Sequence, residues 1–347
     1  MAADESPPEI TAQPPKTPPA SPPSLAEQAP GIERPELRRD CPLIWRGIDV
    51  IQFGVSDDAP KLDRMTPGLA RWLLRLDGLR TWSQIDAELA NGSPSPAPVS
   101  YDDARRALSA ATRAGALDDA AAMPHHWRWI SLDDRERSRA DRAAAALTCR
   151  DSLLANELMD RRHALVVSVI GTGDLAEEMS SAIELSGLSL VASSAPAIDI
   201  RVIADGTHPR IVDEVDTPAH ERPHLAAGLY GSTGIAGPLV VPGVTGCMRC
   251  RHLHARDADP HWPAVSLQIA SSTRRLPIQP HDRLLARLVA AQAALLIRRW
   301  ADDPTDHDQW ADHAIEIRLP SGEQRKLPRP PHPLCGCRWA DAGRAAS

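Results

Sequence analysis

The sequence predicts an α/β protein in which a Rossmann-like domain with a structural zinc site follows a smaller, winged-helix-like domain. Three observations predict this fold class. Strand and helix patterns follow one another in the order β-α-β-β between residues 163 and 204, around a glycine turn. Two close pairs of cysteines lie further along the chain. Short strand patterns and three short helix patterns occupy the region before residue 120.

Length and charge limit the classes of function. A chain of 347 residues is long enough for about two domains. Its net charge of −7 argues against a nucleic-acid binder or an anionic-membrane binder. No apolar run reaches the roughly 20 residues that cross a bilayer, and the acidic, proline-rich start has no apolar export signal. We therefore expect a cytoplasmic protein with reduced cysteines.

Residues 1–38 are expected to form a disordered, proline-rich tail. The stretch from Pro14 to Pro19 favours an extended polyproline conformation and offers little apolar surface to bury. The expected role of this segment is a tether, and a ligand of the PxxP type is the alternative.

Residues 39–120 are expected to form the winged-helix-like domain. Each helix has a recognisable start, because a Ser or Thr side chain can accept a hydrogen bond from the first turn. These starts are Thr66 followed by Pro67, Thr81 with Gln84, and Ser100 with Asp103. The short strand candidates are residues 43–46, 49–53 and 59–63.

The remaining chain is expected to form a connector, a second domain and a short tail. Residues 121–162 contain a charged, alanine-rich helix that begins at Ser131 and continues to about Arg162. Residues 163–340 form the Rossmann-like domain, and residues 341–347 form a tail. The expected strands of this domain are 165–170, 188–192 and 199–204, the helices are 175–185 and 281–300, and a hairpin turns at Ser321-Gly322.

Four of the six cysteines form two tight pairs, the CxxC of Cys247 and Cys250 and the CxC of Cys335 and Cys337. Tetrahedral zinc takes four thiolates, and a pair in a turn supplies two of them with little strain. A redox-active CxxC and unrelated buried thiols are the alternatives. Because four cysteines leave no open coordination position, the expected zinc is structural. Nearby histidines, His252, His254 and His261, are expected to be ordinary surface residues.

The turn Gly171-Thr172-Gly173 follows a strand and opens a helix, as a dinucleotide-binding turn does. Such a site needs an acid about 20 residues further on, where this chain has Ser193. Asp174 adds negative charge where a phosphate would lie. Gly171, Gly173 and Asp205 are the candidate nucleotide-binding residues, but the pattern favours a fold that no longer uses ATP.

The stretch 163–340 resembles E1-like domains of the ThiF/MoeB type, in which a Rossmann-like sheet carries a distal four-cysteine zinc site. The segment Gly237–Gly243 before Cys247, and His332-Pro333-Leu334 before Cys335, look like the E1-like partner proteins of YcaO cyclodehydratases. Those cyclodehydratases act in the biosynthesis of ribosomally made peptides that contain azoline rings. Some of these peptides are bacteriocins. Residues 41–117 also resemble the leader-peptide recognition element of these partner proteins.

This resemblance implies a non-catalytic, leader-peptide-binding subunit that presents a precursor to a YcaO-type cyclodehydratase and leaves the ATP chemistry to it. The leader would add a strand to an exposed edge and pack on a helix. The residues implied in peptide binding are Lys61, Leu62, Asp63, Arg64, Arg105, Arg106, Leu108 and Thr112. The arginines have a second interpretation as an ordinary solvated helix face.

Three alternatives remain open. The first is an active E1-like adenylyltransferase that uses Gly171, Gly173 and Asp205 to activate a carboxylate with ATP. The second is a DNA-binding winged helix, which the acids Asp102 and Asp103 at the start of the third helix disfavour because phosphate would repel them. A homodimer is the third possibility, and it concerns assembly rather than chemistry.

Overall fold

A computed structural model describes residues 24–91, 98–195, 199–204, 222–275 and 282–337. The chain divides into two compact units, residues 1–121 and 122–347. Among the described helices, none combines the length and the hydrophobicity needed to cross a bilayer.

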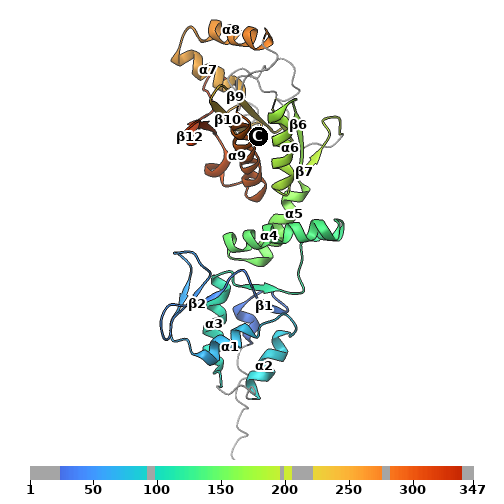
Figure 1. The fold of residues 1–347 in the computed structure, drawn as a ribbon, viewed down its shortest axis with the longest axis vertical. Coiled ribbons are helices and arrows are strands. Elements are labelled where there is room, and N and C mark those ends of the chain that lie inside the picture. The colour runs from blue at the N-terminus through green and yellow to red at the C-terminus, as the bar shows by residue number, and fades with distance from the viewer. Residues whose placement is uncertain (1–23, 92–97, 196–198, 205–221, 276–281, 338–347) are drawn as a thin grey trace, which may run out of the picture. The chain divides into compact units, whose positions relative to one another are not determined.

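The described part of the first unit contains two small antiparallel sheets, one short 3-10 helix and three α-helices (Figure 1). One sheet has the strand order β2-β3-β4, and the other pairs β1 with β5. The strands are β1 (Pro35–Leu37), β2 (Leu43–Trp45), β3 (Ile51–Phe53), β4 (Lys61–Leu62) and β5 (Leu117–Asp119). The helices are η1 (Leu25–Gln28), α1 (Pro67–Leu74), α2 (Trp82–Ala90) and α3 (Tyr101–Arg113).

The helix starts predicted from the sequence are confirmed in this unit. The Thr66 hydroxyl accepts a hydrogen bond from the backbone N–H of Leu69, at 3.1 Å, and Ser100 accepts one from Asp103, also at 3.1 Å. Thr81 and Gln84 form the expected capping box at α2. These local contacts satisfy backbone groups that a helix end would otherwise leave without partners.

The prediction of a disordered tail up to residue 38 is wrong for residues 24–38. Leu25 and Ala29 are buried in the core of the first unit, and β1 pairs with β5. Ser24 and the backbone of Leu25 both donate to the carboxylate of Asp86, at 2.7 and 3.2 Å. Residues 24–38 therefore fold because α2 and α3 offer them an apolar surface and polar partners, which composition alone does not reveal.

The second unit is built on a seven-stranded mixed sheet with the order β12-β11-β10-β9-β8-β6-β7. Neighbouring strands from β7 to β9 pair in parallel, and those from β9 to β12 pair antiparallel. The strands are β6 (Val166–Ile170), β7 (Ser189–Val191), β8 (Ile200–Ile203), β9 (His224–Tyr230), β10 (Thr233–Val240), β11 (His313–Arg318) and β12 (Glu323–Pro328).

Two helices, α6 (Asp174–Leu185) and α9 (Arg283–Asp302), pack side by side against this sheet (Figure 1). Gly234 in β10 allows this close packing, because a Cβ atom there would come within 2.3 Å of Val289 on α9. The remaining helices are η2 (His125–Arg128), α4 (Leu132–Cys149), α5 (Ser152–Ala164), α7 (Met248–Ala258), α8 (Trp262–Arg275) and α10 (His307–Trp310).

The single helix predicted from Ser131 to Arg162 is instead two helices, α4 and α5. Arg150 adopts a left-handed conformation with φ 56°, and Asp151 caps α5 by accepting hydrogen bonds from Leu153 and Leu154. Arg162 attaches α5 to α9. Its guanidinium forms a bidentate ion pair with the carboxylate of Asp302, and both contacts are 2.6 Å. The charged, alanine-rich composition did not indicate this break.

Candidate functional site

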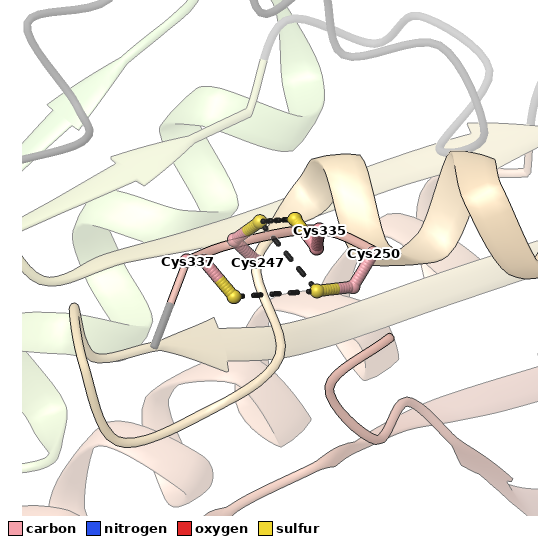
Figure 2. Close-up of side chains that lie close together, drawn as sticks. All are labelled: Cys247, Cys250, Cys335 and Cys337. Atoms are coloured by element: carbon pink, nitrogen blue, oxygen red, sulfur yellow. Dashed lines mark hydrogen bonds between the residues drawn. The ribbon is translucent and has the colours of Figure 1, made fainter. Parts of the chain in front are cut away.

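The structure brings together the four cysteines that the sequence arranges in two pairs (Figure 2). Their sulfur atoms all lie within 4.8 Å of one another, and three of the separations are 3.3, 3.5 and 3.7 Å. Tetrahedral zinc with Zn–S bonds of about 2.3 Å would separate its sulfur ligands by about 3.8 Å. The cluster therefore fits a small tetrahedral ion and offers only soft ligands.

Two chain segments supply these cysteines and approach each other very closely. Cys247 precedes α7 and Cys250 lies in its first turn, whereas Cys335 and Cys337 follow β12. A Cβ atom on Gly246 would lie 2.5 Å from the carbonyl oxygen of Arg329, so only glycine fits without a shift of the backbone.

Asp312 holds these two segments together. Its side chain accepts a hydrogen bond from the backbone N–H of Gly246, at 2.8 Å. Its backbone carbonyl accepts one from the N–H of Arg329, at 2.6 Å. No local sequence pattern indicates this role, because Asp312 is 66 positions from Gly246 in the sequence and approaches it only in the folded chain.

Two of the four thiols, those of Cys247 and Cys335, are difficult to ionise without a cation. Burial raises the pKa of Cys247 to about 11 and also raises the pKa of Cys335. Burial opposes ionisation of Cys250 too, but hydrogen bonds from the backbone of His332 and from neighbouring thiols lower its pKa. A divalent cation would supply the positive charge that four neighbouring thiolates, two of them buried, require.

Histidines near the cluster make other contacts. The ring of His254 bonds the carbonyl oxygen of Pro330 at 3.1 Å, and His252 accepts from the indole of Trp262 at 3.3 Å. His332 bonds Asp257 at 2.8 Å and packs edge-on against His254. These side chains support the segments that carry the cysteines.

The glycine turn has the local form of a dinucleotide-binding turn. β6 ends at Ile170, Gly171 and Gly173 have φ of 145° and 82°, and α6 begins at Asp174. No carboxylate follows β7 at the expected position, where Ser193 is exposed. Asp205 lies outside the described residues.

A positively charged side chain, that of Arg283, lies beside this turn and was not among the residues predicted from the sequence. The guanidinium of Arg283, at the start of α9, is 3.5 Å from the carboxylate of Asp174. The side chain of Arg283 is 76% exposed, so the ion pair is weak. Arg283 is more than 100 residues from the glycine turn in the sequence, so no local motif includes it.

The implied peptide-binding strand is an edge strand of the β2-β3-β4 sheet. The backbone of Phe53 donates to Pro60, and Ile51 lies opposite Leu62. In an antiparallel ladder, hydrogen-bonded pairs alternate with pairs that are not bonded to each other. The N–H and C=O of Lys61 therefore point away from β3, toward the open edge.

The arginines of α3 differ in their surroundings. Arg106 donates to the backbone carbonyls of Asp63 and Arg64, at 2.6 and 3.0 Å, and thereby fixes the end of β4 to the helix. Arg105 is half-exposed, and within the described part of the chain its one ion pair is a 3.5 Å contact with Asp102. Of the two, Arg105 is the one available to an incoming acidic group.

Leu108 and Thr112 do not line an open groove, contrary to the sequence-based expectation. Leu108 is fully buried in the core of the first unit. The Thr112 hydroxyl donates to the carbonyl of Gln28 at 2.9 Å, because η1 packs across this face of α3. The expectation failed because it treated residues 24–38 as unfolded.

Comparisons with known proteins identify the fold. The chain has a TM-score of 0.57 with the heterocyclase TruD, at 16% identity, over 87% of this chain and 42% of that one. It has a TM-score of 0.55 with microcin C7 biosynthetic enzyme MccB in complex with N-formylated MccA, at 12% identity, over 88% of this chain and 99% of that one.

E. coli MccB with ATP gives a TM-score of 0.53 at 12% identity, over 87% of this chain and 99% of that one. No protein-family model and no curated protein matches the sequence. The chain spans less than half the length of the heterocyclase that it matches. At these identities the similarity defines a shared fold.

Proposed function

We propose that this chain binds the leader segment of a ribosomally made precursor peptide and presents it to a YcaO-type cyclodehydratase without adenylating the peptide itself. The observation that carries this proposal is the open edge of β4, where the backbone of Lys61 points away from its own sheet. An extended peptide can pair with such an edge through its main chain.

The similar solved structures support a peptide-related role. One of them is the heterocyclase TruD, and another is E. coli MccB with MccA. The described part of the first unit contains the three-stranded sheet β2-β3-β4 and three α-helices, which supports the proposal of a winged-helix-like recognition domain there. We propose that the four cysteines hold one structural zinc ion and that the protein works in the cytoplasm, where thiols stay reduced.

Charge selectivity in this proposal comes from Arg105. Backbone pairing stabilises any extended peptide, so discrimination needs side chains beside the edge. Arg105 is accessible, whereas Arg106 is engaged with β4. Arg105→Glu should therefore weaken binding of an acidic leader without loosening β4.

The test is calorimetric titration of the full chain with the leader of a neighbouring precursor gene, using Lys61→Pro and Lys61→Ala. Proline removes the outward N–H of residue 61, while alanine keeps it. Loss of one backbone hydrogen bond costs about 0.5–1.5 kcal/mol, so Lys61→Pro should weaken binding by about two- to tenfold. Lys61→Ala should bind like the wild type. Equal binding by both variants, or no binding by the wild type, would contradict the proposal.

A second candidate is an E1-like adenylyltransferase that activates a carboxylate with ATP. Arg283 favours it, since this cation lies beside the turn of Gly171 and Gly173 at the start of α6. The match over nearly the full length of MccB, which has been solved with ATP, agrees with this candidate. Against it are the missing acid after β7 and the negative charge of Asp174 at the helix start.

A further inference from the structure

A cavity of about 500 Å³ lies beside α7, the first residues of α8 and the segment that follows β12. Neither the residues of the glycine turn nor those of β4 line this cavity, so it is separate from both. Its lining residues are Arg251, His254, Ala255, Ala258, Asp259, Trp262, Pro328, Arg329 and Pro330.

The charged groups of this lining are mainly basic. The lining has two guanidinium groups, from Arg251 and Arg329, and a single carboxylate, that of Asp259. That carboxylate already accepts a hydrogen bond from the backbone of His261, at 2.9 Å. A basic cavity in a chain with a net charge of −7 is a local concentration of positive charge.

The rest of the lining is apolar. Trp262 is almost fully buried, and two alanines and two prolines complete the wall. Cavities of this size, with an apolar wall and a few polar groups, are typical of sites for small ligands or for a few side chains of a peptide. The lining therefore suits a ligand that joins an anionic group to an apolar one.

The backbones that carry both arginines lie beside the cysteine cluster and are held by contacts with its neighbours. Arg251 directly follows Cys250, and the backbone of Arg329 bonds Asp312 and touches Gly246. His254 further ties α7 to Pro330 across the cavity. Such rigid placement lowers the entropy lost when a ligand is held.

We propose that this cavity is an oxyanion-binding site that takes a carboxylate or a phosphate attached to an apolar group. Guanidinium groups bind both oxyanions through paired hydrogen bonds, which explains the use of arginine at this place. Trp262 and the alanines contact the apolar portion. This site is independent of leader binding at β4 and of nucleotide binding at the glycine turn.

The experiment is calorimetric titration of the metal-loaded full chain with three probes. Phenyl phosphate and an acetylated, amidated Leu-Glu-Glu-Leu peptide carry the two oxyanions on apolar groups, and the Leu-Gln-Gln-Leu peptide is the uncharged control. Binding of phenyl phosphate alone identifies a phosphate site, and binding of the acidic peptide alone identifies a carboxylate site. Binding of the glutamine peptide with equal affinity would overturn the proposal.

Variants then locate the binding. Arg251→Gln and Arg329→Gln should each weaken the bound probe by about tenfold, the usual effect of losing a charged hydrogen bond. The matched control is Arg325→Gln, which removes the same charge from an exposed position of β12 outside the lining. Ala255→Phe should block the cavity while keeping both charges. The proposal fails if no oxyanion probe binds, or if Arg325→Gln weakens binding as much as the lining variants while Ala255→Phe does not.

Discussion

Cys247 and Cys335 lie 88 positions apart in the sequence, yet their sulfur atoms are 3.3 Å apart. Their grouping with Cys250 and Cys337 was predictable from the sequence, because CxxC and CxC spacings are typical of cysteine pairs that bind one metal ion. The contacts that support the two cysteine-bearing segments could not be predicted from the sequence. Gly246 and Asp312 have no motif, and their role depends on two backbones that meet only in the folded chain.

The first residue-scale prediction concerns the metal. The purified chain should contain about one zinc ion, and Cys250→Ser or Cys335→Ser should release it and lower the melting temperature, because metal binding and folding are coupled. Cys149→Ser is the control, since Cys149 lies outside the cluster. The readouts are elemental analysis and thermal unfolding. A stable, metal-free wild-type chain would contradict the prediction.

The second residue-scale prediction concerns Gly246. Gly246→Ala places a methyl group within 2.5 Å of the Arg329 carbonyl, so the two cysteine-bearing segments must separate. Zinc affinity should fall by about 10- to 100-fold, as for other changes to the surroundings of metal ligands. Competition with a chromogenic chelator measures it. Gly47→Ala is the control, because no atom lies within 4 Å of a Cβ there.

At the scale of elements, local signals predicted where helices begin, but not how segments pair. Thr66, Thr81 and Ser100 cap helices as expected, because capping depends on a few neighbouring residues. The pairing of β1 with β5 and the hairpin of β9 and β10 were missed. β1 and β5 have only three residues each, which is too few to show the alternation of apolar and polar residues that is typical of a strand.

The element-scale prediction concerns η1. Leu25 is fully buried among α2 and α3 residues, so Leu25→Ala should destabilise the first unit by about 2–5 kcal/mol. Chemical denaturation of a fragment of residues 24–121 measures this change. A fragment of residues 39–120 should be less stable still, because it lacks both η1 and β1. Equal stability of the two fragments would show that residues 24–38 add nothing to the fold.

At the scale of the whole molecule, the sequence predicted an α/β class and two domains, and the structure has a mixed sheet in its second unit. The parallel half of that sheet was predictable from β-α-β order. The antiparallel half was only partly predictable. Gly228 in β9 and Pro238 in β10 interrupt the sequence patterns by which a strand is recognised. Long-range sheet order is a property of the complete fold.

The whole-molecule prediction concerns ATP. We expect no ATP–pyrophosphate exchange with any peptide, because Asp174 repels phosphate and no acid follows β7 to hold a ribose. The assay uses the full chain with magnesium and a leader-containing precursor peptide. Micromolar, magnesium-dependent ATP binding that is lost in Asp205→Asn would instead support the adenylyltransferase candidate.

The distance along the chain between the two cysteine pairs has a consequence for biosynthesis. A ribosome makes Cys247 and Cys250 before Cys335 and Cys337, so the nascent chain has only half of the proposed metal site while residues 251–334 are made. Two thiolates bind zinc far more weakly than four. If the cluster binds zinc as proposed, stable uptake follows the emergence of Cys337, and a chain terminated before that residue is left with Cys247 and Cys250 without their two partner ligands.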